Sequence, residues 1–428
     1  MRQLPASTDV LIIGAGPAGT VAGATLAQAG FSVLVVEKQW FPRHVIGESL
    51  LPRCNELLAQ AGLLEAVEGR CYMPKHAAMF FQGERTQRFA FVNSLPGDWT
   101  SSFQVPRDDF DQTLVTAARA RGVDVRFGLE VRDAAFRQDG ATVELLDTES
   151  GAAHAIEAAF VLDCSGPARV LSRLLGLEMP ADILARSAYY THVEGDLRPG
   201  GEEEGDIWVV LHPNGAWIWI IPFSNGRTSV GVVAEQATFD AYPGGDGEKL
   251  WAILRQEPNC AARLARAEPV MKTQRLHGWS TVTKRLHGPG WAVAGNAGDF
   301  LDPVFSSGVM FALESATLAA QLVSRQLKGE AVGWDAAYDG HMQKAIGTFK
   351  TFVQAWYSGE LPRIFFSPVK PERDIMSICS ILGGNVLNEE NYLVRDGCRK
   401  GLDRMLMGLK LLEAGMKARA EAVAKAQA

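Results

Sequence analysis

Residues 10–37 read VLIIGAGPAGTVAGATLAQAGFSVLVVE, and this stretch decides the fold of the N-terminal part of the chain. The apolar run from Val10 to Ile13 is typical of a parallel strand that is buried on both faces. A glycine-rich turn follows, then an alanine-rich stretch that predicts a helix ending at Gly30, then a second apolar strand ending at Glu37. This order of strand, turn, helix and strand predicts the unit that binds a dinucleotide.

Three glycines in the turn have the G-x-G-x-x-G spacing, and each has its own physical role. Gly14 permits the tight turn, Gly16 lets the backbone approach a pyrophosphate, and Gly19 lets the helix pack against the sheet. The free N–H groups at the helix start, around Ala18, favour a phosphate charge. Glu37 can accept hydrogen bonds from ribose hydroxyls and would repel a 2′-phosphate, so NADP is not expected here.

The remainder of the chain predicts one sheet region and one helical region. Residues 188–233 are extended and aromatic-rich, with hairpin signals at 213–215 and 225–226, which favours an antiparallel sheet. Residues 142–146 are expected to pair with residues 155–159, and Phe160 to Asp163 to form a separate buried strand. Beyond Met310 the pattern is mostly helical and ends in a charged amphipathic stretch.

These patterns predict an α/β protein with interleaved domains. We expect a Rossmann-like FAD-binding domain, an antiparallel β-sheet substrate domain and a helical C-terminal region. The expected boundaries are 1–70, 101–175 and 285–330 for the FAD-binding domain, 71–100 and 176–284 for the sheet domain, and 331–428 for the helical region.

Composition excludes several other classes of function. The net charge of −7 gives no electrostatic reason to bind nucleic acid, which requires clustered basic residues. The six cysteines form no C-x-x-C pair and have no histidine at metal-ligand spacing, so neither a dithiol centre nor a metal site is expected. No apolar signal stretch precedes the first strand, and the longest apolar region is interrupted by glycines. The sequence therefore predicts a cytoplasmic protein with no membrane span.

A second motif favours FAD over NAD. Residues 295–303 read GNAGDFLDP and resemble the second flavin motif of FAD proteins of the glutathione-reductase and hydroxylase type. Further stretches resemble flavin-dependent halogenases and related FAD-dependent oxidoreductases, over about residues 8–325. They are FPR at 41–43, IGESLLP at 46–52, FQVPR at 103–107, DCSG at 163–166 and FLDPVFSSGV at 300–309.

The resemblance implies FAD as the cofactor and adds residues to the glycine turn as its ligands. In this sequence they are Lys38, Arg43, Ser49, Arg107, Asn296, Asp299, Pro303, Gly308 and Val309. Asn296 stands where the family usually has Asp, and its amide can still bond a ribityl hydroxyl.

Lys75 is the catalytic residue that the resemblance implies. The segment PKHAAMF at 74–80 is similar to the lysine segment of the halogenases, with Ala77 where glycine is usual. In that family the lysine handles hypohalous acid and delivers electrophilic halogen to an aromatic carbon. A desolvated ammonium suits this role because its charge polarises the oxidant and its pKa responds to burial. The alternative is a solvated surface lysine.

Two more stretches are similar to halogenase motifs around the tunnel between flavin and substrate. Trp217 and Trp219 lie in WIWIIP, at a spacing that places both on one face of a strand, where they could separate substrate from flavin or simply be core residues. The tunnel and halide residues that the resemblance implies are Phe300, Ser306 and Ser307, beside Gly308. Phe305 replaces the Glu of tryptophan-specific halogenases, so free tryptophan is not the expected substrate.

The preferred function is therefore halogenation of an electron-rich phenol or pyrrole with reduced FAD, O₂ and halide. A separate flavin reductase is expected, since no nicotinamide domain is evident, and the substrate could be free or tethered to an acyl or peptidyl carrier protein. The alternative is a dehydrogenase, reductase or monooxygenase acting directly on an apolar polyene or aryl-polyene. A non-enzymatic flavin-binding protein is a third reading.

Overall fold

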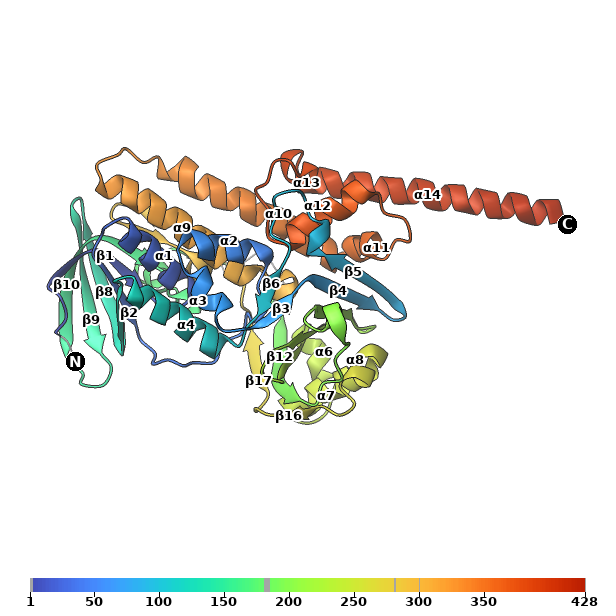
Figure 1. Cartoon of the computed structure of the whole chain (residues 1–428), viewed down its shortest axis with the longest axis horizontal. Helices are drawn as coiled ribbons and strands as arrows, with labels where there is room; N and C mark the ends of the chain where they lie inside the picture. The colour runs from blue at the N-terminus through green and yellow to red at the C-terminus, as the bar shows by residue number, and fades with distance from the viewer. Residues whose placement is uncertain (1–2, 181–184, 281, 300, 428) are drawn as a thin grey trace.

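The computed structural model describes residues 3–180, 185–280, 282–299 and 301–427, with side chains as far as residue 416. Figure 1 shows two β-rich lobes side by side, with helices covering one side of both and a long C-terminal helix projecting beyond them. This agrees with the fold class expected from the sequence.

The first lobe contains the nucleotide-binding sheet, in the order β19-β20-β10-β1-β2-β7. The strands β20, β10, β1, β2 and β7 run parallel, and the apolar runs of β1, β2 and the second half of β10 are typical of strands buried in such a sheet. Helix α1 (Pro17–Gln28) follows the glycine turn and is almost entirely buried. The strands are β1 (Ser7–Ile13), β2 (Val33–Glu37), β7 (Asp124–Phe127), β8 (Leu129–Arg137), β9 (Gly140–Asp147), β10 (Ala153–Asp163), β19 (His287–Gly288) and β20 (Trp291–Val293).

Strand β10 is longer than expected. Thr142 pairs with Glu157 as the sequence indicated, but the strand then continues without interruption to Asp163. Its first half pairs with β9 in a meander and its second half lies between β1 and β20. The two strands expected from the sequence are therefore one strand that joins the meander to the central sheet.

The second lobe contains a sheet in the order β16-β12-β15-β14-β13-β4-β5, with β17 beside β12. The two hairpins expected near residues 214 and 226 are present, and all pairs are antiparallel except β4 with β13. Its strands are β4 (Ala77–Gln82), β5 (Arg85–Ala90), β12 (Ser187–Glu194), β13 (Ile207–Leu211), β14 (Trp217–Pro222), β15 (Thr228–Ala234), β16 (Glu268–Pro269) and β17 (Gln274–His277).

Short elements connect the lobes. The strands β3 (Met73–Lys75) and β6 (Ser102–Gln104) pair with each other, and Ser49 forms a bridge to Gln104. A second two-stranded pair consists of β11 (Glu178–Met179) and β18 (Val282–Thr283). The helices around the lobes are α2 (Pro52–Gln60), α3 (Leu64–Glu68), α4 (Arg107–Ala120), α5 (Val170–Leu174), α6 (Gln236–Asp240), α7 (Asp246–Gln256) and α8 (Pro258–Arg263).

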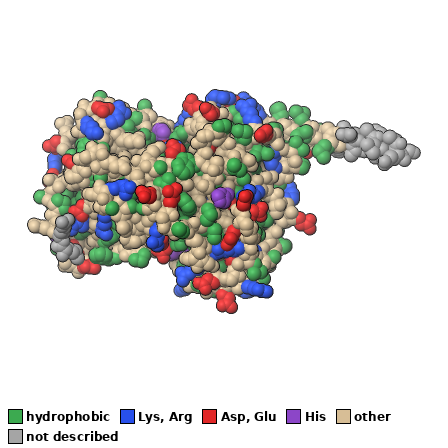
Figure 2. Space-filling view, in the orientation of Figure 1, with side chains coloured by type: hydrophobic (Ala, Val, Ile, Leu, Met, Phe, Trp, Pro, Cys, Tyr) green, Lys and Arg blue, Asp and Glu red, His purple; other side chains and the backbone are tan. Residues whose placement is uncertain are grey.

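Helices of the C-terminal third cover both lobes and continue one hydrophobic core across them. Helix α9 packs against α1, and a single buried cluster includes residues from α1, from the inner face of β14 and from α10. The helices are α9 (Ser307–Leu327), α10 (His341–Tyr357), α11 (Glu360–Phe365), α12 (Glu372–Leu382), α13 (Tyr392–Arg395) and α14 (Cys398–Gln427). Apolar side chains of α14 such as Leu411 and Met416 are exposed. Figure 2 shows hydrophobic side chains (green) where the projecting helix leaves the body of the molecule.

Candidate active site

The glycine turn between β1 and α1 has three glycines that are needed for different reasons. Gly14 has a φ of +99°, and a methyl group there would lie 2.6 Å from the Cys164 carbonyl oxygen. A methyl group at Gly19 would lie 1.9 Å from the carbonyl oxygen of Gly14. Within the described ranges, a methyl group at Gly16 would contact only Nη2 of Arg43, at 3.5 Å. Gly14 and Gly19 are therefore required by packing, whereas Gly16 leaves open the space in front of the helix start.

The carboxylate of Glu37 lies at this turn, at the end of β2. It is buried, its Oε2 accepts a hydrogen bond from the N–H of Ala15 at 3.0 Å, and its Oε1 accepts from the N–H of Gln39 at 2.8 Å. Each oxygen has capacity for another donor, which is what two ribose hydroxyls would supply.

Arg43 is the cation beside Gly16. Its guanidinium packs on the ring of Phe41 at 4.6 Å, and its Nη2 lies 3.5 Å from Oδ2 of Asp111. Within the described part of the chain, its buried Nε has no hydrogen-bond partner. A buried N–H left without a partner costs free energy, so an anion beside Gly16 would satisfy it.

Residues 41–49 form a segment that we call the strap. Arg107 holds the strap in place: its Nη1 donates to the Ile46 carbonyl at 2.7 Å, and the rest of its guanidinium pairs with Asp111. A methyl group at Gly47 would lie 3.5 Å from Val309, so the strap runs from Arg43 at the glycine turn to the first turn of α9. Arg107 is thus occupied by protein groups.

Two other residues expected to bind the cofactor have different surroundings. Lys38 has a side chain that is 60% exposed, and its Nζ pairs with Glu130 at 2.9 Å, in a surface ion pair. Ser49 is buried, and its Oγ finds no partner among the described residues. Lys38 therefore does not face the glycine turn, whereas Ser49 retains a free hydroxyl.

The second flavin motif lies between β20 and α9. The buried Oδ1 of Asn296 has no partner in the described ranges, and Asp299 accepts a hydrogen bond from the N–H of Thr283 at 3.0 Å. Burial raises the pKa of the Asp299 carboxyl. Pro303 begins a short 3₁₀ turn, and Ser306, at a φ of +58°, precedes the helix that starts with Ser307, Gly308 and Val309. Phe300 lies outside the described residues.

Together these residues fit FAD. An open helix N-terminus, an unpartnered guanidinium N–H and a carboxylate with spare acceptor capacity suit the ADP part. The unpartnered amide oxygen of Asn296 suits a hydroxyl of the ribityl chain.

Lys75 is at the end of β3 and is only 1% exposed. Its Nζ donates to the carbonyl of Leu50 at 2.9 Å and lies 5.5 Å from the ring centre of Phe91. Burial lowers the pKa of the Lys75 ammonium to about 7, against a smaller opposite effect of Cys54 and Asp206. The alternative of a solvated surface lysine is therefore wrong.

Trp217 and Trp219 lie on the inner face of β14, with their ring centres 5.9 Å apart. Nε1 of Trp219 donates to the Ser229 hydroxyl at 3.0 Å, and the ring covers Gly231, where a methyl group would lie 2.2 Å from it. This glycine is what lets the indole lie flat against β15.

Nε1 of Trp217 begins a chain of hydrogen bonds that ends at Asp302, just before α9. It donates to the Tyr357 hydroxyl at 3.0 Å, which donates to Oδ2 of Asp302 at 3.0 Å. The Arg186 guanidinium stacks on the Tyr357 ring at 3.4 Å. Burial raises the pKa of Asp302 to about 6 and also raises the pKa of Tyr357. Sequence reasoning did not indicate this polar chain, because nothing in the local sequence around Tyr357 or Arg186 predicts a buried polar contact.

Comparisons with known proteins agree with this geometry. Residues 7–337 match a family model described as FAD binding domain. A 1H-pyrrole-2-carbonyl peptidyl-carrier-protein brominase from Pseudoalteromonas luteoviolacea is 31% identical, over 76% of this chain and 79% of that protein. The chain belongs to the flavin-dependent halogenase family. Its cofactor is FAD, and it is an enzyme of the FAD-dependent oxidoreductase type.

Two further matches cover different shares of their proteins. A tryptophan 2-halogenase from Chondromyces crocatus is 34% identical over 77% of this chain, which spans 63% of that longer protein. A solved structure called a flavoprotein/dehydrogenase, from Cytophaga hutchinsonii, is 40% identical with a TM-score of 0.90, covering 94% of this chain and 99% of that one. The fold is therefore shared with that structure over nearly the whole chain. Separately, no described helix is long and apolar enough to cross a membrane.

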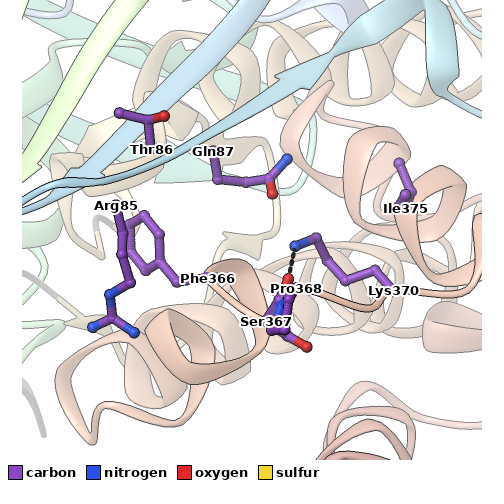
Figure 3. Close-up of a pocket in the computed structure, with 8 residues that line it drawn as sticks. All are labelled: Arg85, Thr86, Gln87, Phe366, Ser367, Pro368, Lys370 and Ile375. Carbon is purple, nitrogen blue, oxygen red and sulfur yellow. Dashed lines mark hydrogen bonds between the residues drawn. The ribbon is translucent and has the colours of Figure 1, made fainter.

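An open hollow lies at the edge of the second sheet, away from the residues described above (Figure 3). This hollow of about 390 Å³ lies between β5 and the segment joining α11 to α12. Arg85 packs there on the ring of Phe366 at 5.3 Å, and Nζ of Lys370 donates to the Phe365 and Ser367 carbonyls. Burial lowers the pKa of Lys370 also, which makes it a useful comparison for Lys75.

Proposed function

We propose that this chain halogenates an electron-rich aromatic compound of the phenol or pyrrole type, with Lys75 as the residue that delivers the halogen. The observation that carries the proposal is a lysine that is 1% exposed and whose Nζ, among the described residues, donates only to a backbone carbonyl. Burial lowers the pKa of this ammonium to about 7. A structural lysine would normally have a carboxylate partner, because a buried unpaired ammonium is costly.

Bound reduced FAD, with O₂ and halide, supplies hypohalous acid as the oxidant. The Lys75 ammonium, oriented by the Leu50 carbonyl, donates a hydrogen bond to the oxygen of this acid and polarises its oxygen–halogen bond. The aromatic carbon takes the halogen and loses its proton to the departing hydroxide. The products are the aryl halide and water.

The other proposed roles are separation of the substrate from the flavin and binding of the halide. Trp217 and Trp219 form a wall whose polar edges are already satisfied by Tyr357 and Ser229, so its inner surface is apolar. The N–H groups of Ser307 and Gly308, at the start of α9, are the proposed halide ligands, and Ser306 precedes them at the helix start. A separate flavin reductase is proposed to supply reduced FAD. The substrate class rests on the relatives, one of which acts on a carrier-tethered pyrrole according to its name.

The test uses the FAD-loaded protein, a flavin reductase, NADH, O₂ and bromide, with an activated phenol or pyrrole as substrate. Mass spectrometry should detect the brominated product with the wild type and none with Lys75→Met, whose flavin stays bound. Lys370→Met is the matched control, because it removes another desolvated lysine that bonds backbone carbonyls. Equal bromination by wild type and Lys75→Met would contradict the role of Lys75.

The second candidate is a flavin enzyme that oxidises or reduces an apolar substrate directly. It is supported by the 40% identity to the solved flavoprotein/dehydrogenase. An anaerobic assay separates the two: a direct dehydrogenase reduces its flavin on mixing with substrate without halide or O₂, whereas a halogenase does not.

A further inference from the structure

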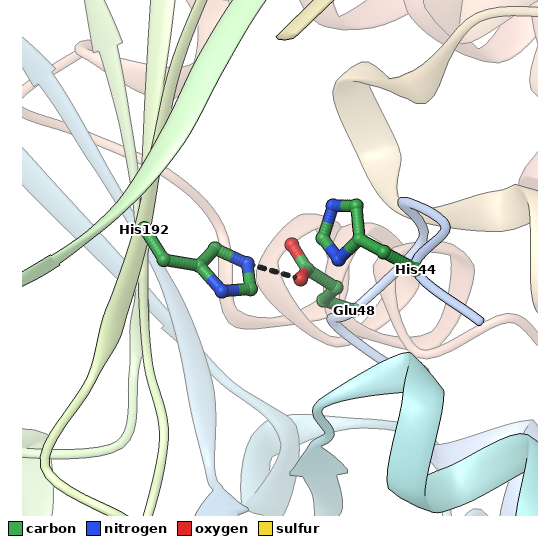
Figure 4. Close-up of side chains that lie close together, drawn as sticks. All are labelled: His44, Glu48 and His192. Atoms are coloured by element: carbon green, nitrogen blue, oxygen red, sulfur yellow. Dashed lines mark hydrogen bonds and ion pairs between the residues drawn. The ribbon is translucent and has the colours of Figure 1, made fainter. Parts of the chain in front are cut away.

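A cluster of three metal-ligating side chains lies where the strap meets the second sheet (Figure 4). His44 and Glu48 are on the strap, and His192 is on β12. One ligand atom from each residue lies within 4.8 Å of the other two. The rings of both histidines flank the carboxyl group of Glu48 in Figure 4.

The carboxyl group of Glu48 is buried without a basic partner of the usual kind. It is 2% exposed, and no Lys or Arg among the described residues pairs with it. Its Oε1 lies 2.6 Å from Nε2 of His192, which is 8% exposed. Because a buried carboxylate is strongly destabilised without a nearby positive charge, this site favours a cation.

The cluster also has unused ligand atoms. In the described part of the molecule, neither ring nitrogen of His44 takes part in a hydrogen bond, and neither does Oε2 of Glu48. An imidazole nitrogen that makes no hydrogen bond is available as a metal ligand. His44 is exposed, which gives an ion a route from solvent.

The three residues are held by their surroundings. The Glu48 carbonyl accepts a hydrogen bond from the N–H of Val105 at 2.7 Å, and the His192 carbonyl accepts from the N–H of Val270 at 2.8 Å. The His44 ring stacks on Tyr190 at 5.9 Å, and the His192 ring lies edge-on to Phe223 at 5.3 Å. Two packed imidazoles on separate elements therefore face one carboxylate across the junction between lobes.

We propose that His44, Glu48 and His192 bind one divalent transition-metal ion, such as Zn²⁺ or Co²⁺. Two imidazole nitrogens and one carboxylate oxygen are a donor set that such ions accept, with the remaining positions filled by water. On binding, the ion replaces the hydrogen bond between His192 and Glu48. It links the strap to β12, so it stabilises the junction between the lobes.

The experiment titrates the FAD-loaded protein, first stripped of metal with a chelator, with Co²⁺ and with Zn²⁺. No substrate, halide or reductant is present, so the result does not depend on the proposed halogenation. Calorimetry gives the stoichiometry and affinity, and the d–d absorption of Co²⁺, read beyond the flavin band, reports nitrogen ligation. The wild type should bind one ion per chain with an increase in Tm.

Variants test the ligands. Glu48→Gln and His44→Ala should each weaken binding by at least about 10-fold, which is the lower range for groups that support a metal site. The control is His287→Ala, in the other three-residue cluster, where His287 lies 3.1 Å from the exposed Asp335. This variant should leave the affinity unchanged.

Several outcomes would overturn the site. One is the absence of stoichiometric binding by wild type that circular dichroism shows to be folded. Another is unchanged affinity in His44→Ala, which alters an exposed residue and so should fold even if Glu48→Gln does not. Binding that disappears only in His287→Ala would place the ion at the other cluster. In each case the pair of His192 and Glu48 would be a hydrogen bond and nothing more.

Discussion

Replacing Gly16 by alanine should separate cofactor binding from folding. In the part of the chain that the structure describes, a methyl group there would contact only Nη2 of Arg43, at 3.5 Å, and the φ of −70° is one that alanine adopts readily. The apoprotein should therefore keep its stability, or gain up to about 1 kcal/mol because alanine restricts the unfolded chain. The methyl group would nevertheless occupy the space through which a diphosphate approaches the backbone N–H groups.

The loss of affinity can be worked from the hydrogen bonds that would be lengthened. One charge-assisted hydrogen bond contributes about 1.5–3 kcal/mol, so losing one raises the Kd for FAD roughly 10- to 150-fold. Fluorescence titration of the apoprotein with FAD measures the Kd, and urea unfolding measures stability. Gly347→Ala is the matched control: among the described residues this helical glycine has no neighbour within 4 Å of the added methyl group, so α10 should gain about 1 kcal/mol with FAD affinity unchanged.

Wild-type affinity in a folded Gly16→Ala protein would refute the assignment of this turn to the diphosphate. A large loss of apoprotein stability would instead show that Gly16 is required by packing, as Gly14 and Gly19 are. Gly19→Ala provides that comparison, because its methyl group would lie 1.9 Å from a carbonyl oxygen and should unfold the turn itself.

Three other predictions follow from individual side chains. Lys75 has a pKa of about 7 in the folded protein and about 10.4 when unfolded, so below pH 10 the unfolded chain binds more protons. On lowering the pH from 9 to 7 the wild type should therefore lose about 2 kcal/mol of stability relative to Lys75→Met, because Lys75 of the folded protein is itself partly protonated at pH 7. A pH-independent difference would contradict the burial of an unpaired amine. Tyr357→Phe removes the hydroxyl between Trp217 and Asp302 and should cost about 1–3 kcal/mol in urea unfolding, whereas an unchanged midpoint would show that neither group needs it. Arg43→Gln should raise the Kd for FAD by about 10-fold or more in the same titration, because it removes the charged guanidinium whose Nη2 lies beside Gly16 and whose Nε has no partner among the described residues, and an unchanged Kd would exclude contact with the phosphate.

The sequence predicted what depends on local backbone geometry. The roles of Gly14 and Gly19 could be assigned from spacing alone, because a turn between a buried strand and a helix has few solutions. The strand burial and both hairpins of the second sheet followed from periodicity and turn residues. Periodicity did not predict that β10 is one continuous strand. Its hydrophobic pattern changes from alternating to fully apolar at the point where its neighbouring strands change, because its first half is partly exposed and its second half is buried.

Residue types and family likeness identified Lys75, Arg43 and Asn296 as candidates, and the structure supplied the surroundings that give them chemistry. Lys75 was as compatible with a surface charge as with a buried amine until its place on β3 was known. The family likeness also suggested Lys38 as a cofactor ligand, and in the structure its side chain pairs with Glu130 at the surface.

The contacts that only tertiary structure decided join residues far apart in the chain. His192 meets Glu48 across 144 residues, and Trp217 meets Tyr357 across 140. No local pattern encodes such pairs, because each depends on how two lobes and a helix pack around a shared core. The glycine turn, by contrast, is fixed within one strand–helix unit, so the sequence alone identified the FAD-binding turn, whereas the polar contacts around it required the packed fold.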